Sequence, residues 1–330
     1  MNYTTVFLSA LCLFSWWGTS PGGSAPPPSA TSSPQAISSA APVVRAILRN
    51  YRLMASLHFN ATITGRADPA AIRAVGSKAG VLRARFVFWG AGRRYRTNYS
   101  VISPAAFQAE DCQVAFDGRR FQLLYAPTRT LYISKKRPVN AVVPIIPNPA
   151  LMPAMFLAPL PDAKRPSNPS LSQLQQPHSS LVTAFWRRFS KDGGRFICGA
   201  NGGPNALVAP AGTMNGIPVS YVVTVSRRIR SLPRRIVVVD QHGKRSARVQ
   251  FSRYRAFKVG RSSVYVPSQI NDAVWGAGTL PALTETIRLH QIAVGGRMPP
   301  GIFVIDFHMA NVVLDGDKRT AQQVPRSGPP

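Results

Sequence analysis

The residues of this chain that could do chemistry are few and scattered. Asp306 and His308 would share one face of a strand, and His290 lies in a preceding strand-like segment, an arrangement that could form a general base or a metal site. No further ligand spacing accompanies them. Only two glutamates, Glu110 and Glu285, are present, so paired-carboxylate chemistry has little raw material. We therefore expect no enzymatic activity, no metal and no cofactor.

Two short motifs that resemble ion-binding loops lack the residues such loops need. The stretch GANGGPN, which begins at Gly199, has no Lys-Ser/Thr of a phosphate loop and is predicted to be a turn. The stretch Asp315-Gly316-Asp317 is too short for a calcium loop.

Two cysteines, Cys112 and Cys198, remain if an N-terminal leader is removed. An oxidising compartment would let them form a disulfide bond, and the alternative is two buried free thiols. Sequence does not show whether the two Cα atoms approach each other, so both alternatives stay open.

Strand-like segments between Leu82 and Lys136 follow one another with only turns between them. Successive side chains of a strand alternate across a sheet. In LRARFVFWG this places Leu82, Ala84, Phe86 and Phe88 on one side, opposite Arg83 and Arg85. Gly90 to Gly92, Asp117-Gly118 and Ala126-Pro127-Thr128 supply the turns. The pattern predicts an antiparallel meander with one apolar face.

The rest of the chain continues this pattern, with a few short helices. Helical spacing from Val44 to Tyr51 predicts an amphipathic helix, and PALMPAMFLA and SLVTAFWRRF are expected to form two short apolar helices. Later strands include Ser246 to Phe257, where a slip in alternation near Ser252 indicates a β-bulge, and Gly301 to Phe307.

Charge and composition predict the kind of partner and the domain boundaries. The 40 Lys and Arg outnumber the 12 Asp and Glu, and a net charge of +28 attracts polyanions. An apolar run from Val6 to Trp17 followed by small residues is typical of a signal peptide. We predict a signal peptide at 1–25, a disordered linker rich in Pro, Ser and Ala at 26–42, one folded domain at 43–317 with a polar insertion at 161–179, and a disordered tail at 318–330.

Three stretches resemble the LolA/LolB-like carriers of periplasmic lipoprotein localisation. They are RFVFWGAGRRYRTN from Arg85, VAFDGRRFQLLYAPTRTLYI from Val114 and IVVVDQHGKRSARVQFSRYR from Ile236. The resemblance implies a mainly β protein with short helices, in which an incomplete antiparallel β-barrel, a half-barrel, surrounds a hydrophobic cavity under a helical lid. It also implies that acyl chains are held in that cavity without a metal or covalent chemistry.

Candidate site residues follow from these two faces. Those expected to line the cavity are Phe86, Phe88, Tyr95, Phe121, Leu123, Tyr125, Met152, Met155 and Phe156. The alternative is that these side chains simply pack on one another. Those expected to contact an anionic surface are Arg83, Arg85, Arg94, Arg96, Arg227, Arg228 and Arg230, the alternative being a solvated face.

The sequence therefore predicts an exported, periplasmic or envelope-associated monomer that carries a lipid or an acylated protein. Its arginine-rich exterior is expected to contact anionic envelope surfaces. The alternative is a non-enzymatic structural or polyanion-binding envelope protein with a filled core. No specific nucleic acid is expected, because the aromatic residues are not interleaved with arginines on one surface.

Overall fold

The computed structural model describes residues 37–38, 40–69, 80–92, 94–103, 111–135, 185–190, 194–198, 205–214, 217–229, 231–275 and 280–325. The predicted signal peptide, the PALMPAMFLA helix with Met152, Met155 and Phe156, the insertion at 161–179 and Arg230 lie outside these residues. The prediction of a helical lid is therefore not tested here.

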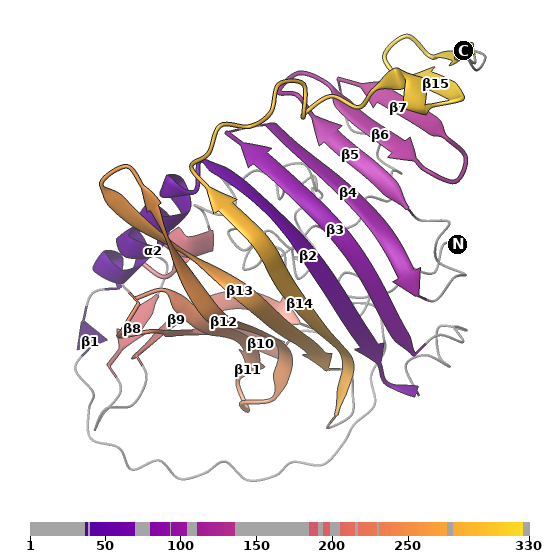
Figure 1. Cartoon of the computed structure of the whole chain (residues 1–330). Helices are drawn as coiled ribbons and strands as arrows, with labels where there is room; N and C mark the ends of the chain where they lie inside the picture. Colours follow the sequence, from indigo (N-terminus) through magenta and orange to yellow (C-terminus); the bar gives the residue numbers. More distant parts are fainter. Residues whose placement is uncertain are drawn as a thin grey trace.

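Within the described residues, sixteen strands form one sheet (Figure 1). The first group comprises β2 (Ser56–Ala67), β3 (Val81–Ala91), β4 (Arg94–Ser103), β5 (Cys112–Phe116), β6 (Phe121–Tyr125) and β7 (Thr130–Ser134). The second group comprises β8 (Arg195–Ile197), β9 (Asn205–Met214), β10 (Ile217–Val225), β11 (Pro233–Asp240), β12 (Arg245–Val259), β13 (Ser262–Trp275) and β14 (Pro281–Val294). The remaining strands are β1 (Ile37–Ser38), β15 (Val312–Asp315) and β16 (Thr320–Gln323).

The sheet order shows how the two groups join. It runs β1-β8-β9-β10-β11-β12-β13-β14-β2-β3-β4-β5-β6-β7-β15-β16, so the late strand β14 pairs with the early strand β2. Neighbouring strands are antiparallel except β15 and β7, which are parallel. The edge strands β1 and β16 do not pair, so the sheet bends without closing (Figure 1). The prediction of a mainly β protein built on an antiparallel sheet is confirmed.

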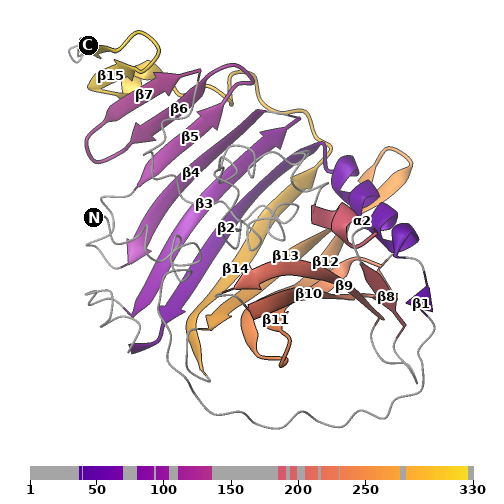
Figure 2. The same ribbon diagram turned by 180° about the vertical axis from the view of Figure 1, so that it is seen from behind.

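One helix, α2 (Ala41–Leu53), packs on one face of this sheet, which we call the inner face (Figure 2). Its apolar residues repeat at helical spacing, and Val44, Ile47 and Tyr51 are buried, as predicted. On the same helix the buried Asn50 side chain donates to the carbonyl of Tyr265 at 3.0 Å and accepts from the N–H of Tyr265 at 2.9 Å. These two bonds tie α2 to β13.

The turns predicted at Asp117-Gly118 and at Ala126-Pro127-Thr128 are confirmed, whereas the first turn begins at Gly92, because Gly90 and Ala91 still belong to β3. Gly92 and Gly118 have φ values of 59° and 100°, which a side chain would disfavour. The Asp117 carboxylate accepts from the N–H groups of Arg119 and Arg120, both at 2.7 Å, which explains how Asp-Gly closes the β5–β6 hairpin.

The prediction of a strand from Gly301 to Phe307 is wrong. Pro299 and Pro300 have no N–H to donate, Gly301 has a φ of 71°, and the chain forms turns followed by the 3₁₀ helix η4 (Phe307–Met309). The alternation nevertheless has a structural meaning. Phe303 and Ile305 are buried and Val304 is exposed, because this segment lies across a face of the sheet and does not pair at its edge.

Two further differences concern boundaries and register. The folded part reaches beyond 43–317, since Ile37–Ser38 pair with β8 and Thr320–Gln323 pair with β15. The irregularity expected near Ser252 is at Arg253, whose φ is 53°. It is not a bulge with an extra residue, because Ser252 pairs with Gln269 and Tyr254 pairs with Pro267 at equal spacing.

Candidate binding face

The inner face of β2 to β7 brings the predicted cavity residues together. Strand pairing places Phe88 beside Phe59 on β2 and beside Thr97 on β4, and the row continues through Val114 to Leu123. Phe86 and Tyr125 belong to the next row, which comprises Ala61, Phe86, Tyr99, Cys112 and Tyr125. Tyr95 and Phe121 belong to a third row, which comprises Gly90, Tyr95, Phe116 and Phe121. The six described cavity candidates therefore occupy one face.

Aromatic packing on this face is close. The ring of Phe59 lies 5.6 Å from that of Phe86, edge to face, and 5.3 Å from that of Phe88, stacked. A Cβ at Gly90 would lie 2.8 Å from Cε1 of Phe88, so the absence of a side chain at Gly90 makes room for this ring. Phe88 is fully buried and Tyr125 is half-buried.

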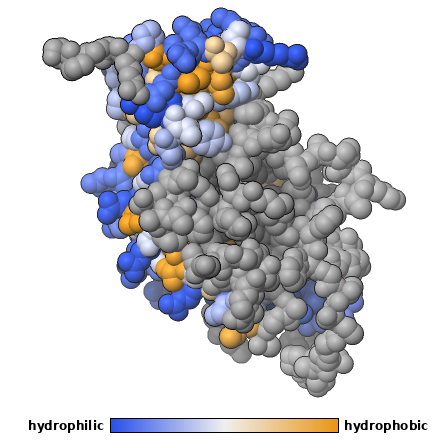
Figure 3. Space-filling view, turned by 90° about the vertical axis from the view of Figure 1, so that its right-hand side faces the viewer, coloured by the Kyte–Doolittle hydropathy of each residue, from blue (hydrophilic) through white to orange (hydrophobic). Residues whose placement is uncertain are grey.

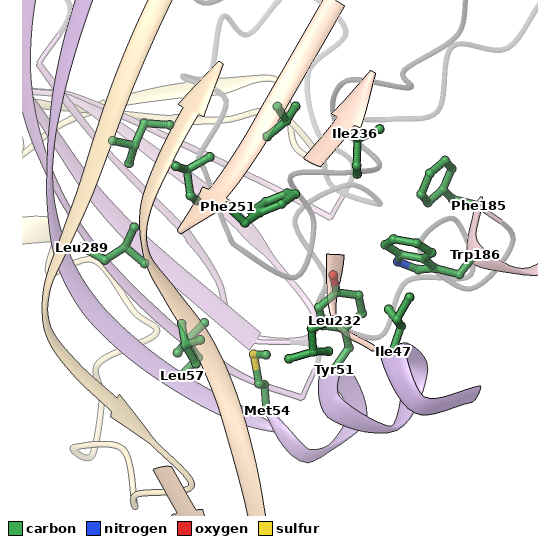
Figure 4. Close-up of a cluster of buried hydrophobic side chains, with 14 of the residues drawn as sticks. Ile47, Tyr51, Met54, Leu57, Phe185, Trp186, Leu232, Ile236, Phe251 and Leu289 are labelled. Atoms are coloured by element: carbon green, nitrogen blue, oxygen red, sulfur yellow. The ribbon is translucent and has the colours of Figure 1, made fainter. Parts of the chain in front are cut away.

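The same apolar core continues to the place where α2 packs on the sheet (Figure 4). Ile47 and Tyr51 from α2 lie near Trp186, which with Phe185 belongs to a short helical turn, and the ring centres of Tyr51 and Trp186 are 6.1 Å apart. Met54 follows directly after the helix and lies closer to Leu57. Four residues of the sheet and Leu232, just before β11, complete this part of the core: Leu57, Ile236, Phe251 and Leu289 are the four. The helix expected in SLVTAFWRRF is thus present over its described part, 185–188.

A few buried polar atoms interrupt the apolar surface. In the part of the chain that the structure describes, the hydroxyl of Thr97, the indole N–H of Trp186 and one carboxylate oxygen of Glu285 have no hydrogen-bond partner. An unpartnered buried polar group costs stability, so such atoms indicate positions where a ligand could form hydrogen bonds.

Two carboxylates that the sequence interpretation missed face each other on this surface. Asp272 on β13 and Glu285 on β14 are directly paired, and both are buried. The sequence interpretation considered only the two glutamates and did not identify Asp272 as a partner of Glu285. The available signal was alternation: in QINDAVW and TETIRL the acidic residue stands at an inner position, between apolar residues two places away.

The arginines predicted to meet an anionic surface divide into two groups. Arg83 and Arg85 are exposed on the outer face of β3, and Arg228 is exposed in the turn after β10. Arg227 donates to the side-chain oxygen of Asn205. Arg230 lies outside the described residues.

Arg94 and Arg96 contact another segment of the same chain. After β14, residues 295–311, the crossing segment, pass over the outer face toward β15 (Figure 1). The Arg96 guanidinium donates to the carbonyls of Ile302 and Val304, both at 3.3 Å, and its partial burial lowers its pKa. Arg94 lies 4.9 Å from the ring centre of Phe303.

The crossing segment also explains why β6 is buried on both faces. Its outer residue Leu124 joins Ala115, Leu131, Ile305 and Ala310 in a second, smaller core. In the upper part of Figure 3, the surface of the described residues is mainly hydrophilic, with a few hydrophobic residues among them.

The residues considered for catalysis are not brought together. The Asp306 carboxylate accepts from the N–H of His308 at 2.9 Å and so caps η4, while His290 on β14 lies beside the Thr62 hydroxyl at 3.2 Å. Within the part of the chain described here, no group of three or more His, Cys, Asp and Glu side chains could hold a metal ion. The Asp315-Gly316-Asp317 stretch is a turn, in which Asp317 accepts from Ser134 and from the N–H of Lys135.

No disulfide bond joins Cys112 to Cys198. Cys112 is buried on the inner face of β5, and Cys198 is half-buried just after β8. No helix among the described residues is long and apolar enough to cross a membrane.

Solved structures similar to this one include a LolA superfamily protein. A LolA superfamily protein from Nitrosomonas europaea matches at 11% identity over 82% of this chain and 99% of its own, with a TM-score of 0.41. A domain from Vibrio parahaemolyticus, provisionally described as an outer membrane lipoprotein-sorting protein, matches at 8% identity over 79% of this chain and 94% of its own, with a TM-score of 0.40. A DUF1329 family protein from Desulfovibrio piger matches at 10% identity over 79% and 96%, with a TM-score of 0.38.

These structural matches include the LolA superfamily, as the sequence resemblance predicted, at low sequence identity. Likeness at such TM-scores does not assign a function to this chain. No protein-family model and no curated protein matches the sequence.

Proposed function

We propose that this protein is an exported carrier of the cell envelope that holds the acyl chains of a lipid or a lipoprotein against its inner face. In this proposal the unclosed sheet forms a half-barrel, and the apolar segment around Met152, Met155 and Phe156 acts as its lid. The protein acts by binding alone, as a monomer and without a cofactor.

The observation that carries the proposal is the continuity of the inner face. Paired inner positions are apolar from Phe251 on β12 through Ile270, Ile287 and Ile63 to Ala84 on β3. From there the aromatic rows around Phe86 and Phe88 extend the apolar surface across β4, β5 and β6. An apolar surface with adaptable aromatic side chains suits a flexible hydrocarbon chain better than it suits a polar substrate.

Charge supports an envelope location as the second part of the proposal. The exposed Arg83 and Arg85 point away from the inner face, and the chain has a net charge of +28. Such an exterior is attracted to anionic headgroups, with roughly 1 kcal/mol for each Arg near the surface. The protein would then approach a membrane with its outer face while the inner face holds the acyl chain.

The second candidate is a structural or polyanion-binding envelope protein whose core is filled. The close aromatic packing of Phe59, Phe86 and Phe88 favours it, since side chains that satisfy one another need no cargo.

Native mass spectrometry of the full chain, purified without detergent, separates the two. A carrier retains co-purified lipid, whose mass is lost after organic extraction and returns when the protein is incubated with phospholipid vesicles. A protein that never takes up lipid, yet binds lipopolysaccharide in a salt-sensitive manner, is the filled-core alternative.

A further inference from the structure

Asp272 and Glu285 form the acidic pair of the inner face. They are paired residues of the neighbouring strands β13 and β14, and they are only 5% and 3% exposed. Side chains directly opposite each other on one face of an antiparallel pair have Cβ atoms about 4.5 to 5.5 Å apart. The two carboxyl groups are therefore close neighbours in an environment that penalises charge.

The strand register defines what surrounds this pair. In its own row, Ile236 and Val249 lie on one side, and Gly65 and Leu82 lie on the other. The neighbouring inner positions in the rows above and below are apolar as well: Ala247, Val274, Leu283 and Ala67, and Phe251, Ile270, Ile287 and Ile63. Among these described positions, none brings a lysine, an arginine or a histidine to the pair.

One oxygen of the pair lacks a partner. Oε1 of Glu285 is buried and, among the described residues, has no hydrogen-bond partner. At the next position toward β2 stands Gly65, which contributes only backbone. A buried carboxyl oxygen without a hydrogen-bond donor lowers the stability of the folded protein. A ligand group that donates to this oxygen removes that cost, and this gain adds to the energy of the contact itself.

The protonation of the two carboxyls determines which kind of ligand group can supply these hydrogen-bond donors. Burial raises the pKa of both carboxyls, and the neighbouring Asp272 raises that of Glu285 further. Two carboxyls this close do not both ionise readily, so near neutral pH they share a proton and carry at most about one negative charge. A single cation with several N–H donors matches that charge and those acceptors, whereas a phosphate or a carboxylate would be repelled.

We propose that Asp272 and Glu285 form an anchoring site in the inner face for the primary ammonium group of an acyl-chain ligand. The site rests on the proposed function, because the hydrocarbon chain lies along the apolar rows on either side of it. Two of the few acidic residues of a strongly basic chain are thus placed where they select the polar end of the cargo. An aminated amphiphile is preferred, and an anionic one is excluded from this point.

Three probes of equal chain length test this: dodecylamine, dodecanol and dodecanoic acid. Each is titrated into the full-length protein below its critical micelle concentration at neutral pH, with affinity measured by calorimetry. The expected order is dodecylamine tighter than dodecanol by about tenfold or more, with dodecanoic acid weakest. Glu285→Gln and Asp272→Asn, which keep size and shape, should bring dodecylamine to within about threefold of dodecanol.

Asp306→Asn is the matched control, since it removes an exposed carboxylate of the outer face and an asparagine can still cap η4. It should keep the preference of the unmodified protein for the amine. Unchanged dodecanol binding by Glu285→Gln shows that the variant is folded and that its apolar surface is intact.

The possible failures are distinct. If dodecanol binds but dodecylamine is not preferred, or if Asp306→Asn removes the preference as completely as Glu285→Gln does, the anchoring site is refuted and the carrier function stands. If none of the three probes binds, the proposed function itself fails, and the anchoring site fails with it.

Discussion

The side-chain oxygen of Gln122 accepts a hydrogen bond from the N–H of Ile305 at 2.6 Å, in a buried position between residues 183 apart in the sequence. Gln122 lies on the outer face of β6 and Ile305 lies in the crossing segment. This bond, with those from Arg96, attaches the crossing segment to the sheet after β14. A buried polar side chain on an outer face is thus explained by the segment that covers it.

Replacing Gln122 by Leu should destabilise the protein by about 1 to 3 kcal/mol, because the buried N–H of Ile305 loses its only acceptor seen here. Denaturant unfolding measures the loss, and amide exchange of Ile305 should become faster than that of β3. Gln322→Leu, on the exposed strand β16, is the control and should stay within about 0.5 kcal/mol. Equal effects of the two changes would show that the crossing segment does not depend on this bond.

Gly90→Ala should destabilise by about 1 to 3 kcal/mol, since the new Cβ would overlap the buried ring of Phe88, and well-packed cores tolerate extra methyl groups poorly. Thermal unfolding measures this. Gly296→Ala is the matched control, because a Cβ there meets nothing within 4 Å. A Gly90→Ala protein as stable as the control would show that the ring of Phe88 moves freely, which a loosely filled inner face would allow.

The local pattern of this fold could be predicted from the sequence, but its long-range arrangement could not. The alternation of LRARFVFWG correctly separated the buried Phe86 and Phe88 from the exposed Arg83 and Arg85, because a strand with one buried face shows its register in its residue types. The pairing of β14 with β2 depends on residues more than 200 positions apart, and no local signal shows it.

The errors have physical causes as well. In GIFVIDF the alternation correctly indicated one buried side, but periodicity does not tell whether that side packs under a sheet or over it. The contacts of Arg94 and Arg96 with the crossing segment could not be predicted, because that segment lies about 200 positions further along the chain. Glu285 was set aside because carboxylates are scarce, although its position on an otherwise apolar inner face was the informative feature.

The acidic pair should make stability fall as pH rises. Burial raises the pKa of Asp272 from its ordinary value of 3.8 to about 7, so the folded state holds a proton that the unfolded state releases. The stabilising contribution is complete below 3.8 and is lost as pH passes through about 7, with a slope of at most about 1.4 kcal/mol per pH unit for each proton.

The double change Asp272→Asn with Glu285→Gln removes this pH dependence. The unfolding free energy of the variant, relative to that of the unmodified protein, should therefore increase steadily over about four pH units, from roughly pH 4 to roughly pH 8. Denaturant titrations at constant ionic strength measure it, with Asp306→Asn as the exposed control. A constant difference across this range would mean that the two carboxyls are not buried together.

The two faces of β3 should respond differently to the same new charge. Phe88 is fully buried on the inner face, whereas Arg85, three residues earlier, is exposed on the outer face. We expect Phe88→Glu to abolish uptake of a fluorescent long-chain alcohol and Arg85→Glu to leave uptake intact. Arg85→Glu should instead weaken sedimentation with phosphatidylglycerol vesicles by at least about 1 kcal/mol at low salt, and much less at high salt.

Because a buried glutamate can unfold a domain, Phe88→Ala is measured beside Phe88→Glu, and cooperative unfolding is required of every variant compared. The truncated side chain should reduce uptake of the alcohol while leaving vesicle binding at the unmodified level. This separation follows from strand alternation alone, since adjacent side chains of β3 cannot reach the same surface. Identical behaviour of folded Phe88 and Arg85 variants in both assays would show that one surface performs both tasks, and the carrier proposal would then lose its physical basis.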